Sequence, residues 1–284
     1  MRVIALEEAP IHQVSYRTVG AGGRVVFTSA PVVVARVDAL SEGLEAVIVT
    51  SDLQGVAPVD SGEAPPALAG VLVAEDMALL CAGGDIPPAE RTGVILAGDL
   101  YARAALDRRG GRGDARPVWR AFAERFRWVV GVPGNHDGYG ATVEEARAFQ
   151  SEPGIHLLDG ATVHLDGLDI AGLGGIVGNP RRDHRRALET FVAEADRLIA
   201  TQPDLLLFHE GPQGPGPDQP GHPVLTQHLA HRADPLIVCG HNHWDAPLAE
   251  LESGLQVLNV DARVVVLVCD APRRSSTITH PHRP

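Results

Sequence analysis

The sequence contains no lysine, so all 24 of its basic residues are arginine. A Walker A phosphate-binding loop needs a lysine, and so does an enzyme that forms a Schiff base or carries pyridoxal phosphate. These classes of protein are therefore excluded. The abundance of Ala, Gly, Pro and Arg indicates a GC-rich coding bias, which accounts for the missing lysine without a functional reason.

Cysteine is scarce as well, with three residues that lie far apart in the chain and no C-x-x-C spacing. This pattern predicts reduced thiols rather than a disulfide framework. The first ten residues include Glu7 and Glu8, which is not typical of a signal peptide, and no apolar run approaches the roughly 20 residues of a membrane span. We therefore expect a cytoplasmic protein with no membrane partner.

Positive charge is also in short supply, because the formal net charge is −12. This argues against a broad electrostatic surface for nucleic acid or anionic membrane, although a local basic channel is compatible with it. Hydrophobic residues make up 44% of the 284 residues, as expected for a globular chain. We expect a single domain over residues 1–284, with residues 1–46 adding N-terminal strands and residues 273–284 forming a frayed tail.

Five short apolar runs are each followed by Asp, Asn or His. They occupy residues 47–50, 94–97, 128–132, 205–208 and 236–239. The polar stretches that follow them are Asp52-Leu53-Gln54-Gly55, Gly98-Asp99, Gly134-Asn135-His136-Asp137, His209, and Gly240-His241-Asn242-His243. Short continuous apolar runs are typical of strands buried on both faces, and open α/β sheets bind ligands at the carboxyl ends of such strands. The pattern predicts one site at the strand ends.

Other segments predict further elements. Helices are expected at residues 67–80, from Pro117 onward, from the capping box at Thr142 onward, and over residues 184–201. Hairpins are expected around Asp166-Gly167 and over residues 256–268, and residues 24–27 and 32–35 read as two strands joined by a turn around Pro31. Residues 107–116 and 212–223 read as loops, the first of them flexible.

In their order and local motifs, the blocks between about residues 45 and 260 resemble the calcineurin-like metallophosphoesterases. The chain departs from the family at Gln54, where the family usually has His. The resemblance implies a four-layer α-β-β-α sandwich, in which helices flank two mixed β-sheets. It also implies a phosphoesterase with two divalent metal ions.

The resemblance assigns the metal ligands residue by residue. Asp99 would bridge the two cations, Asp52 and His243 would complete one position with Gln54 as a neutral oxygen ligand, and Asn135, His209 and His241 would complete the other. Imidazole, carboxylate and amide ligands suit Mn, which Gln54 favours, and also Fe, Zn, Co or Ni. Two such cations clamp the attacking and leaving oxygens of an in-line displacement and give a bridging hydroxide at neutral pH.

The same resemblance gives His136 a catalytic role, in which it contacts the phosphate or protonates the leaving oxygen. Asp137 would hold that imidazole in orientation. Tyr101 and Arg103 follow Asp99 and are candidates to line the substrate cleft, or else they cap and pack the next helix. Each motif alone is typical of an ordinary turn or cap, and it is their joint occurrence in order that indicates the dinuclear site.

Gln54 leaves two interpretations open, a tuned active site or a degraded site in a scaffold protein. The intact remaining positions favour activity. A neutral oxygen ligand weakens cation binding at the first position and favours Mn²⁺. A weakly held cation compensates less negative charge, which favours a phosphodiester, because it carries less charge than a phosphomonoester. A monoesterase and a non-catalytic interaction domain are the alternatives. A metal amidohydrolase is disfavoured, because its His-x-His is expected early and often with a carbamylated Lys.

A set of arginines in two loops would contact the phosphates of a nucleotide or single-stranded nucleic acid, as in a nuclease, or else is solvated surface. These residues are Arg108, Arg109, Arg112, Arg181, Arg182, Arg185 and Arg186.

Overall fold

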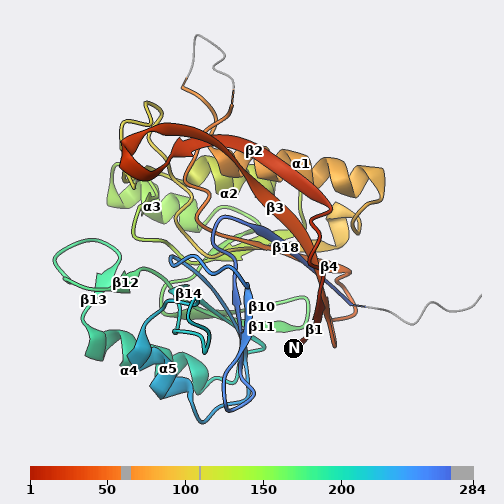
Figure 1. Ribbon diagram of the computed structural model, residues 1–284, viewed down its shortest axis with the longest axis vertical. Coiled ribbons are helices and arrows are strands. Elements are labelled where there is room, and N and C mark those ends of the chain that lie inside the picture. The colour runs from red at the N-terminus through yellow and green to blue at the C-terminus, as the bar shows by residue number, and fades with distance from the viewer. Residues whose placement is uncertain (59–64, 109, 270–284) are drawn as a thin grey trace, which may run out of the picture.

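A computed structural model describes residues 1–58, 65–108 and 110–269, and two mixed β-sheets form its centre (Figure 1). The eight-stranded sheet has the order β1 (Val3–Leu6), β3 (Val25–Val37), β18 (Val264–Cys269), β4 (Ala46–Thr50), β5 (Thr92–Leu96), β7 (Trp128–Gly131), β9 (Ile155–Leu157), with β2 (His12–Val19) paired to β3. The six-stranded sheet has the order β10 (Ala161–Leu165), β11 (Leu168–Leu173), β14 (Leu205–Glu210), β15 (Leu236–Gly240), β17 (Gln256–Asn259), β16 (Leu248–Glu250).

Helices cover the outer face of each sheet. On the eight-stranded sheet lie α1 (Ala69–Gly83), α2 (Arg116–Ala123) and α3 (Val143–Gln150), and on the six-stranded sheet lie α4 (Leu188–Ile199) and α5 (Pro223–Leu229) (Figure 1). Two short 3-10 turns lie at Ala21–Gly23 and Ala89–Arg91. Two-residue strands form two further pairs, β6 (Gly113–Asp114) with β8 (Asp137–Gly138), and β12 (Ile176–Val177) with β13 (Arg185–Arg186). This is the expected α-β-β-α sandwich.

The apolar runs form strands because both of their faces are buried. Along β4, Val47 and Val49 pack between the two sheets, whereas Ile48 packs under the helices of the eight-stranded sheet. On the other sheet, Leu207 faces the same central layer, whereas Leu206 faces α4 and α5. Fully burying an aliphatic side chain contributes about 1.5–3 kcal/mol, so a charged residue within one of these runs would disrupt the sandwich.

The five predicted motif strands are confirmed as β4, β5, β7, β14 and β15. The predicted helix start at Thr142 is also confirmed, because the Thr142 hydroxyl accepts from the Glu145 amide at 3.2 Å. Asp166 and Gly167 join β10 and β11 with φ values of 47° and 82°, the left-handed pair that a tight hairpin requires. Pro117 lies in the first turn of α2, as predicted.

Two strand predictions are wrong. β3 runs through Pro31 without a turn. The Val32 carbonyl accepts a hydrogen bond from the Ile11 amide at 2.8 Å. Because successive residues of a strand direct their backbone groups to opposite edges, the Pro31 nitrogen faces the other edge of β3. At that edge β18 pairs with β3 only from Val32 onward, so the proline nitrogen meets no partner strand. Residues 256–268 are not a hairpin either, because β17 and β18 belong to different sheets.

Two further predictions need correction. The helix expected over residues 184–201 begins only at Leu188, because Arg185 and Arg186 form β13. The loop at residues 107–116 contains β6, which pairs with β8 beside the metal-ligand motif. The expected tail, residues 273–284, lies outside the described residues, as does Arg109. No described helix is long and apolar enough to cross a membrane.

Candidate metal centre

The predicted ligands converge where the carboxyl ends of strands from both sheets meet. Asp99 follows β5 of one sheet and His209 lies near the end of β14 of the other, and Asp99 Oδ2 is 3.4 Å from His209 Nε2. Gly98 makes this approach possible. A Cβ on Gly98 would lie 2.5 Å from the Gly134 nitrogen and 2.8 Å from His209 Nδ1, and its φ of 92° also favours glycine.

Three of the predicted ligands adopt left-handed backbone conformations. The φ values are 54° for Asp52, 55° for Asp99 and 67° for His241, and these residues lie two residues after β4, three residues after β5 and directly after β15. Such conformations cost non-glycine residues of order 1 kcal/mol or more and persist where the surrounding structure fixes them. The sharp turn they create directs the side chain back over the strand end.

Asp99 lies at the centre of the group and is 2% exposed. Its Oδ1 accepts from the His136 amide at 2.9 Å, and its Oδ2 accepts from Gln54 Nε2 at 3.0 Å. Burial by itself raises the pKa of Asp99, but the imidazoles of His209 and His136 outweigh burial and hold the pKa below its usual value. Asp99 is therefore a carboxylate with groups from several motifs around it, as a bridging ligand requires.

His209 is fully buried, and its Nδ1 lies 2.8 Å from the Ala97 carbonyl. That contact requires a proton on Nδ1, so Nε2 is the nitrogen that faces Asp99. Burial lowers the pKa of His209, but the carboxylate of Asp99 outweighs it and raises the pKa to about 10. A position that holds a proton this firmly attracts a metal cation in place of the proton.

Asn135 and His241 complete this position. Asn135 is 8% exposed, and its Oδ1 is buried without a hydrogen-bond partner among the described residues, as is His209 Nε2. One ligand atom each from Asp99, His209 and His241 lie within 4.8 Å of one another. Burial, followed by the charge of His209, lowers the pKa of His241 to about 4, which keeps its imidazole neutral for metal binding. The residues present therefore fit a divalent transition metal.

In the other predicted position, Asp52 and Gln54 are partly buried and His243 is exposed. Asp52 Oδ2 accepts from the His241 amide at 2.8 Å, and burial together with the nearby Asp261 raises the pKa of Asp52 well above its usual value. The Gln54 side chain reaches Asp99, and its amide nitrogen rather than its oxygen faces the carboxylate. The side chain of His243 is 59% exposed, with Nδ1 3.2 Å from Asp261 Oδ1.

The carboxylate of Asp137 does not hold the His136 imidazole, contrary to the sequence-based expectation. It is fully buried, and it accepts from the backbone amides of Asp99 (2.8 Å), Leu100 (2.8 Å) and Gly134 (2.9 Å). Burial, followed by the Asp99 charge, raises the pKa of Asp137 to about 6. The side chain of His136 is 27% exposed, and its Nε2 lies 3.9 Å from Asp99 Oδ2. Asp137 thus shapes the turns that carry the ligands.

The two candidate substrate residues lie against the loop at residues 110–113. Arg103 pairs with Asp107 at 2.8 Å, and its stem packs over Gly111. The ring of Tyr101 packs on Gly113, where a Cβ would lie 2.3 Å from the ring. These contacts favour the packing interpretation over a substrate contact.

Among the loop arginines, Arg112 pairs with Asp183, which joins the two loops, and Arg186 pairs with Asp159 at 2.8 Å and with Glu194 at 2.9 Å. Four others form no ion pair within the part of the chain that the structure describes. They are Arg108, Arg181, Arg182 and Arg185.

Sequence reasoning missed Asn259 and Asp261, both buried at the same edge. A usable pattern was present, because Asn259-Val260-Asp261 follows an apolar run as the other motifs do. The mistaken hairpin over residues 256–268 obscured this pattern.

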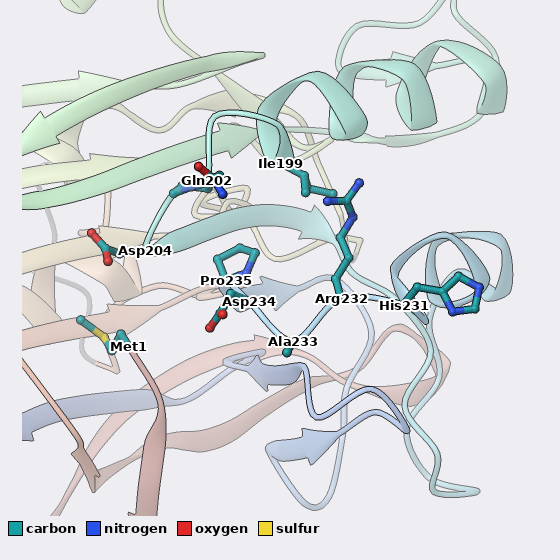
Figure 2. A pocket seen from close by; sticks show the side chains of 10 residues that line it. Met1, Ile199, Gln202, Asp204, His231, Arg232, Ala233, Asp234 and Pro235 are labelled. Atoms are coloured by element: carbon teal, nitrogen blue, oxygen red, sulfur yellow. The ribbon is translucent and has the colours of Figure 1, made fainter.

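A separate polar pocket lies at the other end of the six-stranded sheet. Figure 2 shows side chains that come from the end of α4 and from the turns before β14 and β15, among them Ile199, Asp204 and Asp234. The metal ligands follow the carboxyl ends of these strands, whereas this pocket adjoins their amino ends. It is therefore not part of the candidate metal centre.

The family model described as calcineurin-like phosphoesterase matches residues 46–245, more than two thirds of the chain. No protein with a curated description matches the sequence. Among solved structures, TT1561 of Thermus thermophilus is similar with a TM-score of 0.53 and 16% identity, over 77% of this chain and 90% of that one. At this identity the likeness shows the fold alone.

The sulfate thiohydrolase SoxB of Thermus thermophilus, solved in complex with glycerol, has a TM-score of 0.44 and 14% identity. That alignment covers 82% of this chain and 58% of SoxB.

Proposed function

The chain belongs to the calcineurin-like phosphoesterases, which makes it a metal-dependent hydrolase of phosphate esters, and from this premise we propose that it is a dinuclear phosphodiesterase. Asp99, Asn135, His209 and His241 would hold one cation, and Asp52, Gln54 and His243 would hold the other together with Asp99. When bound, the two cations compensate the negative charge of the phosphate and supply a water of lowered pKa. Mn²⁺ is the proposed metal.

The placement of Gln54 beside Asp99 carries the preference for a diester. A half-turn of its terminal amide brings Oε1 to the place that Nε2 occupies, 3.0 Å from Asp99 Oδ2. In either orientation the side chain brings no charge and is a weaker ligand than imidazole. The first cation is then held more weakly and compensates less charge. A phosphomonoester is largely a dianion near neutral pH, because its second pKa is about 6, whereas a diester carries one negative charge.

His136 is the proposed general acid. Its amide is fixed by Asp99 at 2.9 Å, while its side chain remains 27% exposed and can reach a bound substrate. Gly110 packs against the imidazole, since a Cβ there would lie 2.7 Å from Cε1. The ring is thereby held at the edge of the metal centre, where it can donate a proton to the leaving oxygen.

The proposed natural substrate is a nucleotide or a single-stranded nucleic acid. Arginines without ion pairs in the two loops support this proposal. The ion pair between Arg112 and Asp183 joins the two loops, and Gly110 of the first loop packs against His136. Guanidinium groups bind phosphate oxygens in a bidentate manner. With a net charge of −12, binding would depend on these loops rather than on the whole surface.

The test compares turnover of bis-nitrophenyl phosphate and nitrophenyl phosphate with Mn²⁺, for the wild type and Gln54→His. We expect the wild type to prefer the diester and Gln54→His to shift the preference toward the monoester. Gln150→His, at the exposed end of α3, is the matched control and should behave as the wild type. A wild type that prefers the monoester, with Gln54→His unchanged in preference, would refute the role of Gln54.

Asp99→Ala tests the metal dependence itself. Because Asp99 contacts residues of both positions, its loss should abolish turnover and lower the number of bound cations. Near-normal turnover by folded Asp99→Ala would refute the dinuclear centre. A wild type that binds two cations but hydrolyses neither phosphomonoesters, cyclic nucleotides nor oligonucleotides would indicate a non-catalytic interaction domain.

A further inference from the structure

The segment at residues 259–263 crosses from one sheet to the other beside the metal centre. It leaves β17 of the six-stranded sheet and enters β18 of the eight-stranded sheet. Its polar side chains at alternate positions are almost completely buried, with exposures of 1% for Asn259, 6% for Asp261 and 8% for Arg263. Burying three polar side chains is costly unless each finds a partner, so their contacts indicate what the segment does.

The three side chains bind three successive residues of the turn that carries the histidine ligands. Asn259 Nδ2 donates to the Asn242 carbonyl at 2.8 Å, Asp261 Oδ1 lies 3.2 Å from His243 Nδ1, and Arg263 Nη2 donates to the Trp244 carbonyl.

Two internal hydrogen bonds hold the segment in shape. The Asp261 amide donates to Asn259 Oδ1 at 3.2 Å, and Arg263 Nε donates to the Asp261 carbonyl at 3.3 Å. The segment is therefore a rigid support for this turn.

The backbone of the same segment is tied to the residues that precede Asp52. The Ala262 amide donates to the Ser51 carbonyl at 3.1 Å, and the Thr50 hydroxyl donates to the Arg263 carbonyl at 2.8 Å. Asp52 comes from the eight-stranded sheet and His243 from the end of the six-stranded sheet. The crossover segment thus sets the position of these two predicted ligands relative to each other.

We propose that Asp261 is a positioning residue for the first cation, which directs His243 by binding its Nδ1. This inference rests on the proposed dinuclear function. His243 has a side chain 59% exposed, so little packing restrains its imidazole, and the nearer of its two carboxylate neighbours is the buried Asp261, at 3.2 Å from Nδ1, whereas the exposed Asp245 lies 3.8 Å from Nε2. With Nδ1 donating to the carboxylate, Nε2 is the nitrogen left to bind metal. Carboxylates that orient a histidine ligand in this way typically change metal affinity 10- to 100-fold.

The experiment is a Mn²⁺ titration of the full-length metal-free protein, which measures the number of cations bound and their dissociation constants without using turnover. The variants are Asp261→Ala, which removes the acceptor, and Asp261→Asn, which retains a neutral acceptor. The matched control is Asp169→Asn, because Asp169 also binds a histidine Nδ1, that of His164 at 2.7 Å, but lies at the amino end of β11.

We expect Asp261→Ala to weaken the binding of one cation about 10- to 100-fold and to leave the dissociation constant of the other unchanged. Asp261→Asn should restore a substantial part of the affinity, and Asp169→Asn should match the wild type. Unchanged affinities in Asp261→Ala would overturn the inference. An equal loss of affinity for both cations together with a lowered Tm would also overturn it, because this result would indicate a general structural role. The same holds if Asp261→Asn binds Mn²⁺ as weakly as Asp261→Ala, because Asp261 would then be a metal ligand.

A second measurement does not depend on the variants being folded. Nitrogen-15 NMR of the metal-free wild type should show the His243 tautomer with the proton on Nδ1. The other tautomer, with the proton on Nε2 and none on Nδ1, would overturn the inference. These results are separable from the proposed function. A protein that binds two cations as expected but hydrolyses no phosphate ester would contradict the function and leave the role of Asp261 standing.

Discussion

Replacing Asp137 with Ala should destabilise the protein substantially, because its carboxylate is the acceptor for three buried backbone amides. These amides belong to Asp99, Leu100 and Gly134, and they lie 2.8–2.9 Å from the carboxylate oxygens. The Asp137 side chain is fully buried, so water cannot replace it without opening the turn. The alanine variant leaves all three donors without partners.

The size of the effect follows from these three bonds. Each buried donor left unsatisfied costs about 1–3 kcal/mol. Removing a carboxylate whose pKa burial has raised to about 6 offsets part of this cost, because its ionised form is itself disfavoured. We therefore expect a loss of about 3 kcal/mol in the free energy of unfolding. For a protein of this size that corresponds to a Tm lower by roughly 5 °C.

Asp137→Asn separates the hydrogen bonds from the side-chain volume. The Asn amide keeps one oxygen acceptor, but its NH₂ group faces a backbone N–H where the second carboxylate oxygen had been. The free energy of unfolding should therefore fall by about 1–2 kcal/mol. Asp218→Ala is the control, because Asp218 is exposed and carries no comparable contact. Its free energy of unfolding should stay within about 0.5 kcal/mol of the wild type.

The assay is urea unfolding of each metal-free protein, since bound metal would stabilise the folded state and confound the comparison. An Asp137→Ala variant within about 1 kcal/mol of the wild type would refute the reasoning, because three unsatisfied amides cannot cost so little. A strong loss of turnover without a loss of stability would instead support the role that the sequence suggests for Asp137, which is to orient His136.

Two other predictions concern neighbours of Asp99. His136→Ala should retain the bound metal and lower turnover. The loss of turnover should be smaller for a nitrophenyl ester, because its leaving group needs no proton. If the variant loses metal instead, His136 is a ligand. Gly134→Ala should cost about 1–3 kcal/mol of stability and weaken metal binding, because its Cβ would lie 2.0 Å from Asp99 Oδ1. The control Gly43→Ala, whose Cβ would meet no atom closer than 3.6 Å, should be close to neutral in the same unfolding and metal-titration measurements.

The sequence predicts the central strands well because their pattern has a local cause. A strand covered on both faces, such as β4 or β15, needs apolar side chains at every position. The polar residues that follow such strands then lie at one edge of the sandwich. The position of Asp99 beside His209 follows from these two facts and from the tight turns that end each strand.

The errors arise where distant contacts decide the local structure. Residues 256–268 resemble a hairpin in sequence, but Asn259, Asp261 and Arg263 bind the turn at residues 242–244, and the chain is thereby carried into the other sheet. Pro31 resembles a turn residue, but its nitrogen faces an edge where no partner strand has yet begun.

The roles of the predicted site residues divide in the same way. The sequence predicts that Asp137 lies near Asp99, but a local motif cannot distinguish a carboxylate that orients an imidazole from one that accepts three backbone amides. The identity of the side chain fixes what it can bind, whereas the direction in which it points depends on the neighbouring turns.

The chain's departure from the family pattern, Gln54, lies in the less enclosed half of the metal centre. Three of the four predicted ligands of the second position, Asp99, Asn135 and His209, are buried, so a change of size or charge at one of them leaves an unsatisfied group in the interior. Gln54 and His243 are more exposed, and water can solvate the polar atoms that a substitution leaves without partners. The first position can therefore change its ligands at a lower cost in stability than the second. That difference accounts for a carboxamide at Gln54, where the family usually has an imidazole.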